Sequence, residues 1–410
     1  MKIAVIQSKL NGNGGSQRQT IGYARAFQKL GHEVTVYAIA YDKERCFPAM
    51  CEGLRIVSLP GAFIMPKPLT IPFLGFVNYP RYSRAESNAA RRLSLLIDPD
   101  TDVLHAHDRL AFRVATYYKK NVRNIPSVLM MSDILTKTWI AWRKSQFDPA
   151  LTPGLKQRLF NWIFDTYEVG KYIRPHDAMT TLDIRTRDWA KDYFGKEAVC
   201  VRSGLDIDQF PFVAHEGCSD KRVRILVAGI FFIHRRYEDV VNAVKLLCDA
   251  GYDATLSMIG SYAANNEYRA YHKRLMSLAN SLGIGNRVTC SGEVSEDELR
   301  HSYQTHDVYV SPNHLQSFGL AAFEAMASGL PVVMSNTAGA SEILTNKENA
   351  LIVDAKSPDQ IAAAIRQLVD DGELYQALSR HGRAFVEENI SWERVARETI
   401  RVFNRYVHQG

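Results

Sequence analysis

A strand, a helix and a second strand follow one another closely in residues 3–38, which read IAVIQSKLNGNGGSQRQTIGYARAFQKLGHEVTVYA. The apolar run 3–7 predicts a buried strand, and a polar, glycine-rich loop follows it at 11–16. The next apolar residues recur at three-residue spacing, as expected for a helix, and are Ile21, Ala24, Phe27 and Leu30. Gly31 then ends the helix, and a second strand begins at once. This order predicts a parallel sheet with a right-handed crossover.

The same alternation continues along the whole chain. In the first half we expect further strands at 54–58, 102–106, 126–131, 178–182 and 199–201, with helices at 83–97 and 154–172. In the second half we expect strands at 223–228, 253–259, 287–291, 307–310 and 331–334, with helices at 237–250, 265–283, 295–303 and 319–328. The sequence therefore predicts an α/β protein of two Rossmann-like, doubly wound domains that face a cleft at the carboxyl ends of both sheets.

Composition excludes several classes of protein. The chain has 410 residues, of which 46% are hydrophobic and 23% charged, and its 25 glycines and 15 prolines are ordinary for that length. No apolar run reaches the roughly 18 residues of a membrane-spanning helix. The apolar part of the N-terminus is too short for a signal peptide, so we expect a cytoplasmic protein with reduced thiols. The six cysteines form no cluster of metal ligands.

Charge is distributed unevenly between the two halves. Residues 1–205 contain 30 lysines and arginines against 18 acidic residues, a formal charge of +12, whereas residues 206–410 contain 20 against 26, a charge of −6. A basic first half suggests an anionic partner, such as a phospholipid surface or a phosphorylated substrate, while scattered solvated charge is the alternative. No dense basic run with interleaved aromatic residues indicates nucleic acid.

Two stretches have features of a phosphate or nucleotide site. Gly14 and Gly15 follow the first strand, where glycines allow a ligand to approach the backbone and the next helix offers free N–H groups, although a glycine pair is often only a turn. Residues 311–333 read SPNHLQSFGLAAFEAMASGLPVV, a strand, a polar loop, a helix and a second strand. Glu324 in that helix could accept both hydroxyls of a ribose, or it could be an exposed helix glutamate.

The second stretch resembles the signature of the retaining GT-B nucleotide-sugar glycosyltransferases of family four, or glycosyl transferases group 1. The matching segments are Phe318-Gly319-Leu320, Glu324-Ala325-Met326-Ala327 and Gly329-Leu330-Pro331-Val332-Val333. Supporting similarity occurs at Gly14-Gly15, His105-Ala106-His107, Ser203-Gly204-Leu205-Asp206, Gly292-Glu293-Val294 and Ser391-Trp392. The resemblance implies an acceptor-binding domain at 1–205, a nucleotide-sugar-binding domain at 206–390, and a C-terminal helix at 391–410 that packs back on the first domain.

The resemblance also implies a role for each matching residue. The donor-binding residues would be Gly14, Gly15, Gly292, Val294, Phe318, Gly319, Leu320 and Glu324. The catalytic residues would be His107, Gln316, Arg235 and Arg236. The donor is then a substrate, no further cofactor is expected, and no metal-ligand set is present or required by the family. UDP is favoured because the family uses it most.

Two departures from the family pattern bear on activity. Gln316 stands where the family usually has a glutamate, and it retains hydrogen bonding to a sugar hydroxyl without the charge. Arg235 and Arg236 stand in place of a separate Arg and Lys, and arginine preserves the phosphate-binding role. Gln316 therefore indicates either an altered donor preference or an impaired site.

The resemblance implies an acceptor that is a glycan, a lipid-linked molecule or a small molecule. The apolar loop 62–82 precedes Arg84, Arg91 and Arg92, and it either contacts a membrane or lipid-linked acceptor or packs on its own domain. Trp139 and Trp142 offer a second acceptor wall with the same alternative. Besides a transferase at the inner face of the membrane, two interpretations stay open: a catalytically impaired GT-B partner subunit, and a GT-B nucleotide-sugar epimerase.

Overall fold

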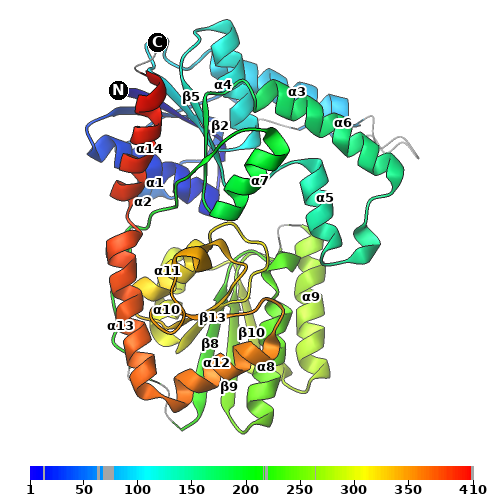
Figure 1. Cartoon of the computed structure of the whole chain (residues 1–410), viewed down its shortest axis with the longest axis vertical. Coiled ribbons are helices and arrows are strands. Elements are labelled where there is room, and N and C mark those ends of the chain that lie inside the picture. The colour runs from blue at the N-terminus through cyan, green and yellow to red at the C-terminus, as the bar shows by residue number, and fades with distance from the viewer. Residues whose placement is uncertain are drawn as a thin grey trace. The chain divides into compact units, whose positions relative to one another are not determined.

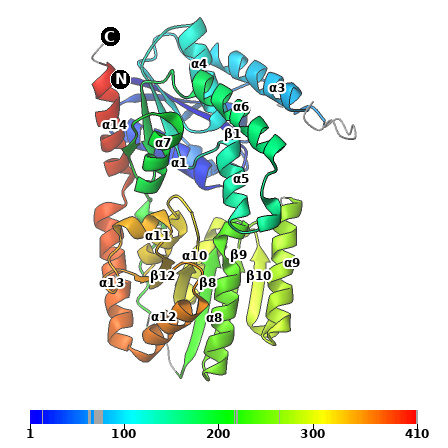
Figure 2. The ribbon, with the colours of Figure 1, turned by 45° about the vertical axis from the view of Figure 1, so that its right-hand side comes forward.

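The computed structural model divides into two compact units (Figures 1 and 2). Unit 1 comprises Met1–Gly204 and Trp392–Gly410, and unit 2 comprises Leu205–Ser391. The described residues are 1–12, 14–61, 65–67, 78–215, 217, 220–263 and 265–407. Within these ranges, no helix combines the length and the apolar character that crossing a bilayer requires.

Unit 1 contains a seven-stranded parallel sheet in the order β3-β2-β1-β4-β5-β6-β7. Its strands are β1 (Lys2–Leu10), β2 (Glu33–Tyr41), β3 (Arg55–Ser58), β4 (Val103–Ala106), β5 (Ser127–Met131), β6 (Ala178–Thr181) and β7 (Val199–Cys200). The order reverses between β1 and β4, whose registers pair Ile3 with Val103 and Ile6 with Ala106. In open α/β sheets, ligands bind beyond the carboxyl ends of the strands at such a point.

Helices cover both faces of the unit 1 sheet. They are α1 (Gly15–Lys29), α2 (Pro48–Cys51), α3 (Asn78–Ser94), α4 (Arg109–Asn121), α5 (Lys137–Ser145), α6 (Leu155–Tyr172), α7 (Ile184–Phe194) and α14 (Trp392–Val407). The larger apolar core lies between the sheet and α3, α4, α6 and α7. On the opposite face α14 packs on α1, where Phe27 and Phe403 are 5.6 Å apart between ring centroids.

Unit 2 repeats this architecture with six parallel strands in the order β10-β9-β8-β11-β12-β13. The strands are β8 (Arg222–Ala228), β9 (Asp253–Ile259), β10 (Val288–Gly292), β11 (Val308–Ser311), β12 (Val332–Ser335) and β13 (Leu351–Val353). The α-helices are α8 (Tyr237–Asp249), α9 (Asn266–Ser281), α10 (Glu296–Thr305), α11 (Leu320–Ala327), α12 (Pro358–Asp370) and α13 (Gly372–Asn389). The order reverses between β8 and β11, which places the ligand-binding edge at their carboxyl ends.

The predicted fold class is confirmed, and each predicted strand and helix has a counterpart within a few residues. The prediction was incomplete because it omitted α2, α4, α5, α7, α12, α13 and β13. Helix α7 alternates charged and apolar residues too closely for a clear apolar face, and β13 has only three residues. Trp139 and Trp142, which were predicted as an acceptor wall, lie on α5, and the side chain of Thr136 caps the start of this helix by accepting from the amide of Trp139.

Candidate active site

Two neighbouring strands of unit 2 lead into loops that contain five of the predicted site residues, namely Arg235, Arg236, Gln316, Phe318 and Gly319. Residues 229–236 follow β8, and residues 312–319 follow β11, its hydrogen-bonded neighbour where the strand order reverses. The backbone amide of His314 donates to the carbonyl of His234 at 2.8 Å. This bond joins the two loops, so the predicted phosphate-binding and sugar-binding segments lie side by side.

The loop after β11 is fixed where it enters α11. Gly319 is the N-cap of α11 with φ of 93°, a left-handed conformation that glycine adopts without steric cost. The amides of Gly339 and Ala340 donate to the carbonyls of Gln316 and Phe318, each at 2.9 Å. The first amides of a helix have no acceptor within it, so this fixed loop places donor groups at the start of α11, beginning near Leu320.

Glu324 lies on the buried side of α11. Its side chain is 6% exposed, and Tyr303 from α10 donates a hydrogen bond to its Oε2 at 2.9 Å. Burial excludes the alternative that Glu324 is an exposed helix glutamate. A buried carboxylate needs hydrogen-bond donors, and the hydroxyl of Tyr303 supplies one of them. Its role as a ribose ligand stays a prediction.

Arg235 and Arg236 differ sharply in their surroundings. Arg236 forms a bidentate pair with Asp239, with Nε to Oδ2 at 2.9 Å and Nη2 to Oδ1 at 2.5 Å, and it also contacts Glu238 at 3.0 Å. Burial alone would lower the pKa of Arg236, but the hydrogen bonds that it donates to Asp239 and the negative charges of Glu238 and Asp239 raise it. The positive charge of Arg236 is therefore balanced by the carboxylates of Glu238 and Asp239 at the start of α8.

Arg235 has no such partner. Its Nε is buried and has no hydrogen-bond acceptor among the residues that the structure describes. The guanidinium lies against the end of β8, because a Cβ placed on Gly229 would be 3.4 Å from Cζ of Arg235. A buried guanidinium N–H without an acceptor costs free energy unless a ligand oxygen accepts its hydrogen bond. Of the two arginines, Arg235 has the geometry expected for a phosphate contact.

Glycines bring the backbones of three strand ends close together. A Cβ on Gly260 would lie 1.9 Å from the carbonyl oxygen of Gly229, and the amide of Gly260 donates to the carbonyl of Gly292 at 2.7 Å. Gly292 has φ of 70°, and a Cβ there would lie 3.3 Å from the ring of Tyr262. Val294 follows as a partly exposed residue. An aromatic ring beside Gly292 suits the predicted base pocket.

In unit 1 the predicted phosphate loop coincides with the start of α1. Gly14 is the N-cap with extended φ and ψ, and Gly15 is the first helical residue. A Cβ on Gly14 would lie 2.5 Å from Oε1 of Gln17, whereas one on Gly15 would meet nothing within 4 Å. Because Oε1 is the end of a flexible side chain that can move aside, this structure requires neither glycine to be small. The diphosphate role of both residues stays a prediction.

His107 is buried at the carboxyl end of β4, with 3% of its surface exposed. Its Nδ1 lies 3.0 Å from Oγ1 of Thr20, and its Nε2 lies 3.0 Å from Nδ1 of His105. The two histidines share one face, as the alternation predicted. Burial lowers the pKa of His107 to about 3, so the ring is neutral at physiological pH. Its contact with a donor sugar stays a prediction.

Two family models together match most of the chain. The model for Glycosyltransferase Family 4 matches residues 13–208, and the model for Glycosyl transferases group 1 matches residues 211–385. The chain belongs to this glycosyltransferase family. The first matched segment corresponds closely to unit 1 without α14, and the second corresponds closely to unit 2.

Relatives along the full length are distant in sequence. The glycosyltransferase is 25% identical over 423 residues to an uncharacterized glycosyltransferase of Methanocaldococcus jannaschii. The aligned region covers 98% of each of the two chains. It is 22% identical to mannosylfructose-phosphate synthase of Agrobacterium fabrum, over 94% of this chain and 85% of that protein.

Solved structures share its fold. Anabaena HepE in complex with UDP and glucose has a TM-score of 0.71 at 15% identity, over 99% of this chain and 100% of that one. Sucrose-phosphate synthase from Thermosynechococcus elongatus has a TM-score of 0.72 at 19% identity, over 98% of each chain. The fold of the glycosyltransferase is GT-B.

Sequence reasoning missed several residues that shape these sites. Tyr303 holds Glu324, Asp239 neutralises Arg236, and Thr20 contacts His107. Asn313 is buried after β11, donates to Ser311 at 2.7 Å, and has an Oδ1 without a donor in the described part of the chain. A polar residue directly after a buried strand was the available signal for Asn313. Tyr303 and Thr20 lie on other elements than the residues they contact, so spacing could not reveal them. Asp239 follows Arg236 by three residues, a spacing that is typical of an ion pair on a helix.

Proposed function

We propose that the protein is a retaining, metal-independent glycosyltransferase that uses a nucleoside-diphosphate sugar, with a UDP-sugar favoured. The observation that best supports this proposal is the buried Nε of Arg235 beside Gly229, which has no acceptor in the described part of the chain. Its loop is hydrogen-bonded to the loop that leads into α11. A guanidinium and helix amides at one sheet edge are suited to a diphosphate, which gains negative charge as the glycosidic bond breaks.

The chemistry requires little from a general base. In a front-face transfer the departing diphosphate can accept the acceptor's proton, so the protein mainly stabilises the leaving group and orients the sugar. Arg235 and the α11 amides would stabilise the leaving group, and Glu324 would accept hydrogen bonds from the ribose. Gln316 would contact a sugar hydroxyl. His107, being neutral, would offer hydrogen bonding but no charge.

The comparisons support a nucleotide-sugar donor and leave its base and sugar open. HepE was solved with UDP and glucose, whereas a Mycobacterium tuberculosis relative, 28% identical over 236 residues, is a GDP-mannose-dependent mannosyltransferase. UDP stays favoured because several structural neighbours contain it. We propose a glycan, lipid-linked or small-molecule acceptor, a cytoplasmic location and contact of unit 1 with a membrane.

The first experiment measures thermal unfolding of the full chain with a panel of nucleoside diphosphates and their sugars. A ligand at 100 times its Kd adds about 2.7 kcal/mol to the free energy of unfolding, so the correct donor gives a clear shift. Glu324→Ala should lose the shift, while Glu373→Ala, an exposed glutamate on α13, should retain it. No shift with any nucleotide would refute the donor-binding part of the proposal.

The second experiment tests the reaction itself. With the identified donor, the anomeric configuration of the product is read by proton NMR, and turnover is compared with and without EDTA. Inversion would refute retention, and loss of turnover in EDTA would refute metal independence. Nucleotide-sugar binding without any transfer would favour the impaired partner subunit.

A further inference from the structure

Helix α6 of unit 1 presents a continuous apolar face to solvent. The exposed residues are Leu155, Leu159, Trp162, Ile163 and Tyr167, which we call the α6 ridge. Their spacing places them along one face of the helix, over about 18 Å at 1.5 Å per residue. Leu155 is 84% exposed and Trp162 is 63% exposed. Contiguous apolar surface of this kind marks an interaction site.

Basic side chains flank this ridge. Helix α3 runs beside α6 in both views of the molecule (Figures 1 and 2), and its exposed residues include Arg84, Arg91 and Arg92. At the C-terminal ends of α3, α4 and α6, a cavity of about 560 Å³ is lined by Arg91, Lys120 and Lys171, among others. No carboxylate lines this cavity. Cations in the last turns of these helices also offset the helix dipoles, which accounts for some of them but not for Arg84.

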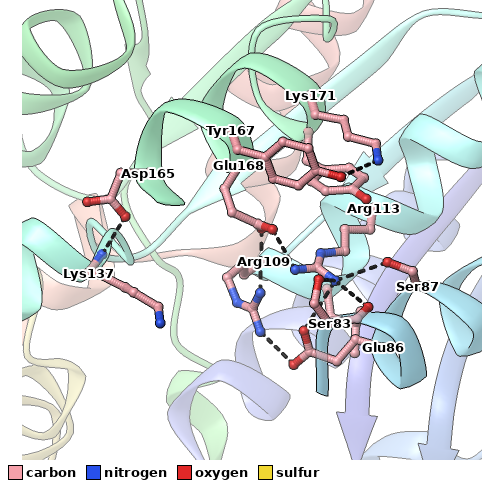
Figure 3. A network of polar contacts seen from close by, with 12 residues as sticks. Ser83, Glu86, Ser87, Arg109, Arg113, Lys137, Asp165, Tyr167, Glu168 and Lys171 are labelled. Atoms are coloured by element: carbon pink, nitrogen blue, oxygen red, sulfur yellow. Dashed lines mark hydrogen bonds and ion pairs between the residues drawn. The ribbon is translucent and has the colours of Figure 1, made fainter. Parts of the chain in front are cut away.

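The ridge and the basic cavity meet on α6. Nζ of Lys171 lies 4.8 Å from the ring centroid of Tyr167, so the last ridge residue contacts a residue that lines the cavity (Figure 3). Nζ of Lys171 also lies 5.1 Å from the ring of Tyr172. The apolar and cationic parts therefore form one surface.

A buried ion-pair network fixes α3 and α6 to each other beneath this surface (Figure 3). Arg113 of α4 is fully buried and contacts Glu168 of α6 at 2.6 Å and Glu86 of α3 at 3.3 Å. Arg109 contacts Glu86 at 2.6 Å and Glu168 at 3.5 Å. Buried ion pairs contribute little net stability, but they fix geometry, because breaking one leaves an unpaired buried charge. The network thus holds the two exposed helices in one arrangement.

We propose that the α6 ridge and the adjoining basic residues dock unit 1 on the surface of an anionic phospholipid bilayer. Leucine, isoleucine and tryptophan on one helix face enter the boundary of headgroups and acyl chains, and nearby arginines and lysines meet lipid phosphates. A second copy of the chain fits less well, because a symmetric contact would bring Arg84, Arg91 and Arg92 against like charges. The excess of 12 positive charges in residues 1–205 has the sign that such a surface attracts.

The test is flotation of the full chain with vesicles of phosphatidylcholine alone or mixed equally with phosphatidylglycerol. We expect binding to the anionic vesicles that weakens with salt. Leu159→Ser with Trp162→Ser should reduce partitioning more than tenfold, through lost apolar burial. Arg84→Glu with Arg92→Glu should reduce it at least 25-fold, at about fivefold per cation removed.

Matched controls lie on unit 2. Leu246→Ser changes an exposed leucine of α8, and Arg366→Glu changes an exposed arginine of α12, and both should bind like the unaltered protein. Equal binding to both vesicle types would overturn the proposal, as would a ridge variant that binds like its control. Self-association lost in the ridge variant, with vesicle binding unchanged, would instead assign the ridge to a second copy. The assay uses no sugar donor, so its result is independent of the proposed reaction.

Discussion

Replacing Arg235 and Arg236 one at a time should have opposite consequences, although the two residues are adjacent and chemically identical. We expect Arg235→Ala to slow transfer strongly and leave stability nearly unchanged. We expect Arg236→Ala to lower stability and to leave turnover in the folded fraction largely intact. The difference follows from their partners, since Arg236 is paired with Asp239 and Arg235 Nε has no acceptor in the described structure.

The magnitudes follow from burial. Asp239 is 2% exposed, and removing Arg236 leaves its carboxylate unpaired, which for a buried pair costs about 3–5 kcal/mol. Because the Arg236 side chain is 20% exposed, water partly replaces it, and we expect about 2–3 kcal/mol. Removing one donor to a developing oxyanion typically costs a factor of about 10²–10³ in rate, which is the expected effect of Arg235→Ala.

The assay combines urea unfolding with steady-state kinetics on the same preparations. Unfolding is followed by two probes, because a protein with two compact units need not unfold in one step. Arg235→Lys serves as the conservative variant, since it retains a charge but not the planar fork of donors. It should recover part of the lost turnover.

Two results would refute this reasoning. A loss of stability in Arg235→Ala equal to that in Arg236→Ala would show that Arg235 has a structural partner. An equal loss in kcat and in ground-state donor affinity for Arg235→Ala would remove its leaving-group role, because that role requires an interaction strongest in the transition state.

Three further predictions concern other residues. Glu324→Gln retains an acceptor for Tyr303 but loses the charge, and should raise the Kd of the nucleoside diphosphate about tenfold by calorimetry; unchanged affinity would contradict the ribose role. Gln316→Glu should lower activity or change donor preference, whereas activity gained from none would indicate an impaired native site. Burial lowers the pKa of His107 from its ordinary value of 6.5 to about 3. The unfolded state then protonates first, and the free energy of unfolding falls by at most about 1.4 kcal/mol per pH unit from about pH 6.5 toward 3. His107→Gln should reduce that slope in urea unfolding, and an unchanged slope would count against a buried neutral ring.

The sequence was sufficient for the architecture because the strands of both sheets are parallel and buried. Such strands appear as short apolar runs, and β1, β8 and β11 were recognised on that basis. The helix that begins after Gly319 was placed within one residue. Helices with many charged or small residues, such as α7, were missed because their buried face depends on tertiary packing.

The sequence named candidate site residues, and the structure adds the contacts that distinguish them. The sequence proposed both Arg235 and Arg236 for the diphosphate, and only the position of Asp239 distinguishes them. Burial of His107 depends on Thr20 and His105, which spacing alone could not show. Trp139 is buried against Trp142 and Trp189. It therefore packs within its own domain, which was the alternative to forming an acceptor wall. Of the apolar loop, residues 62–64 and 68–77 lie outside the described residues.

The contact of α14 with α1 has a consequence for the order in which the chain folds. The ring of Trp392 covers Gly22 of α1, where a Cβ would lie 2.2 Å from it, and the backbone of Trp392 similarly leaves no room for one on Gly204. Unit 1 therefore packs completely only when α14, which follows unit 2 in the sequence, is available. As the chain leaves the ribosome, the strands of both sheets are made before α14, so the α1 face of unit 1 stays uncovered until α14 is available.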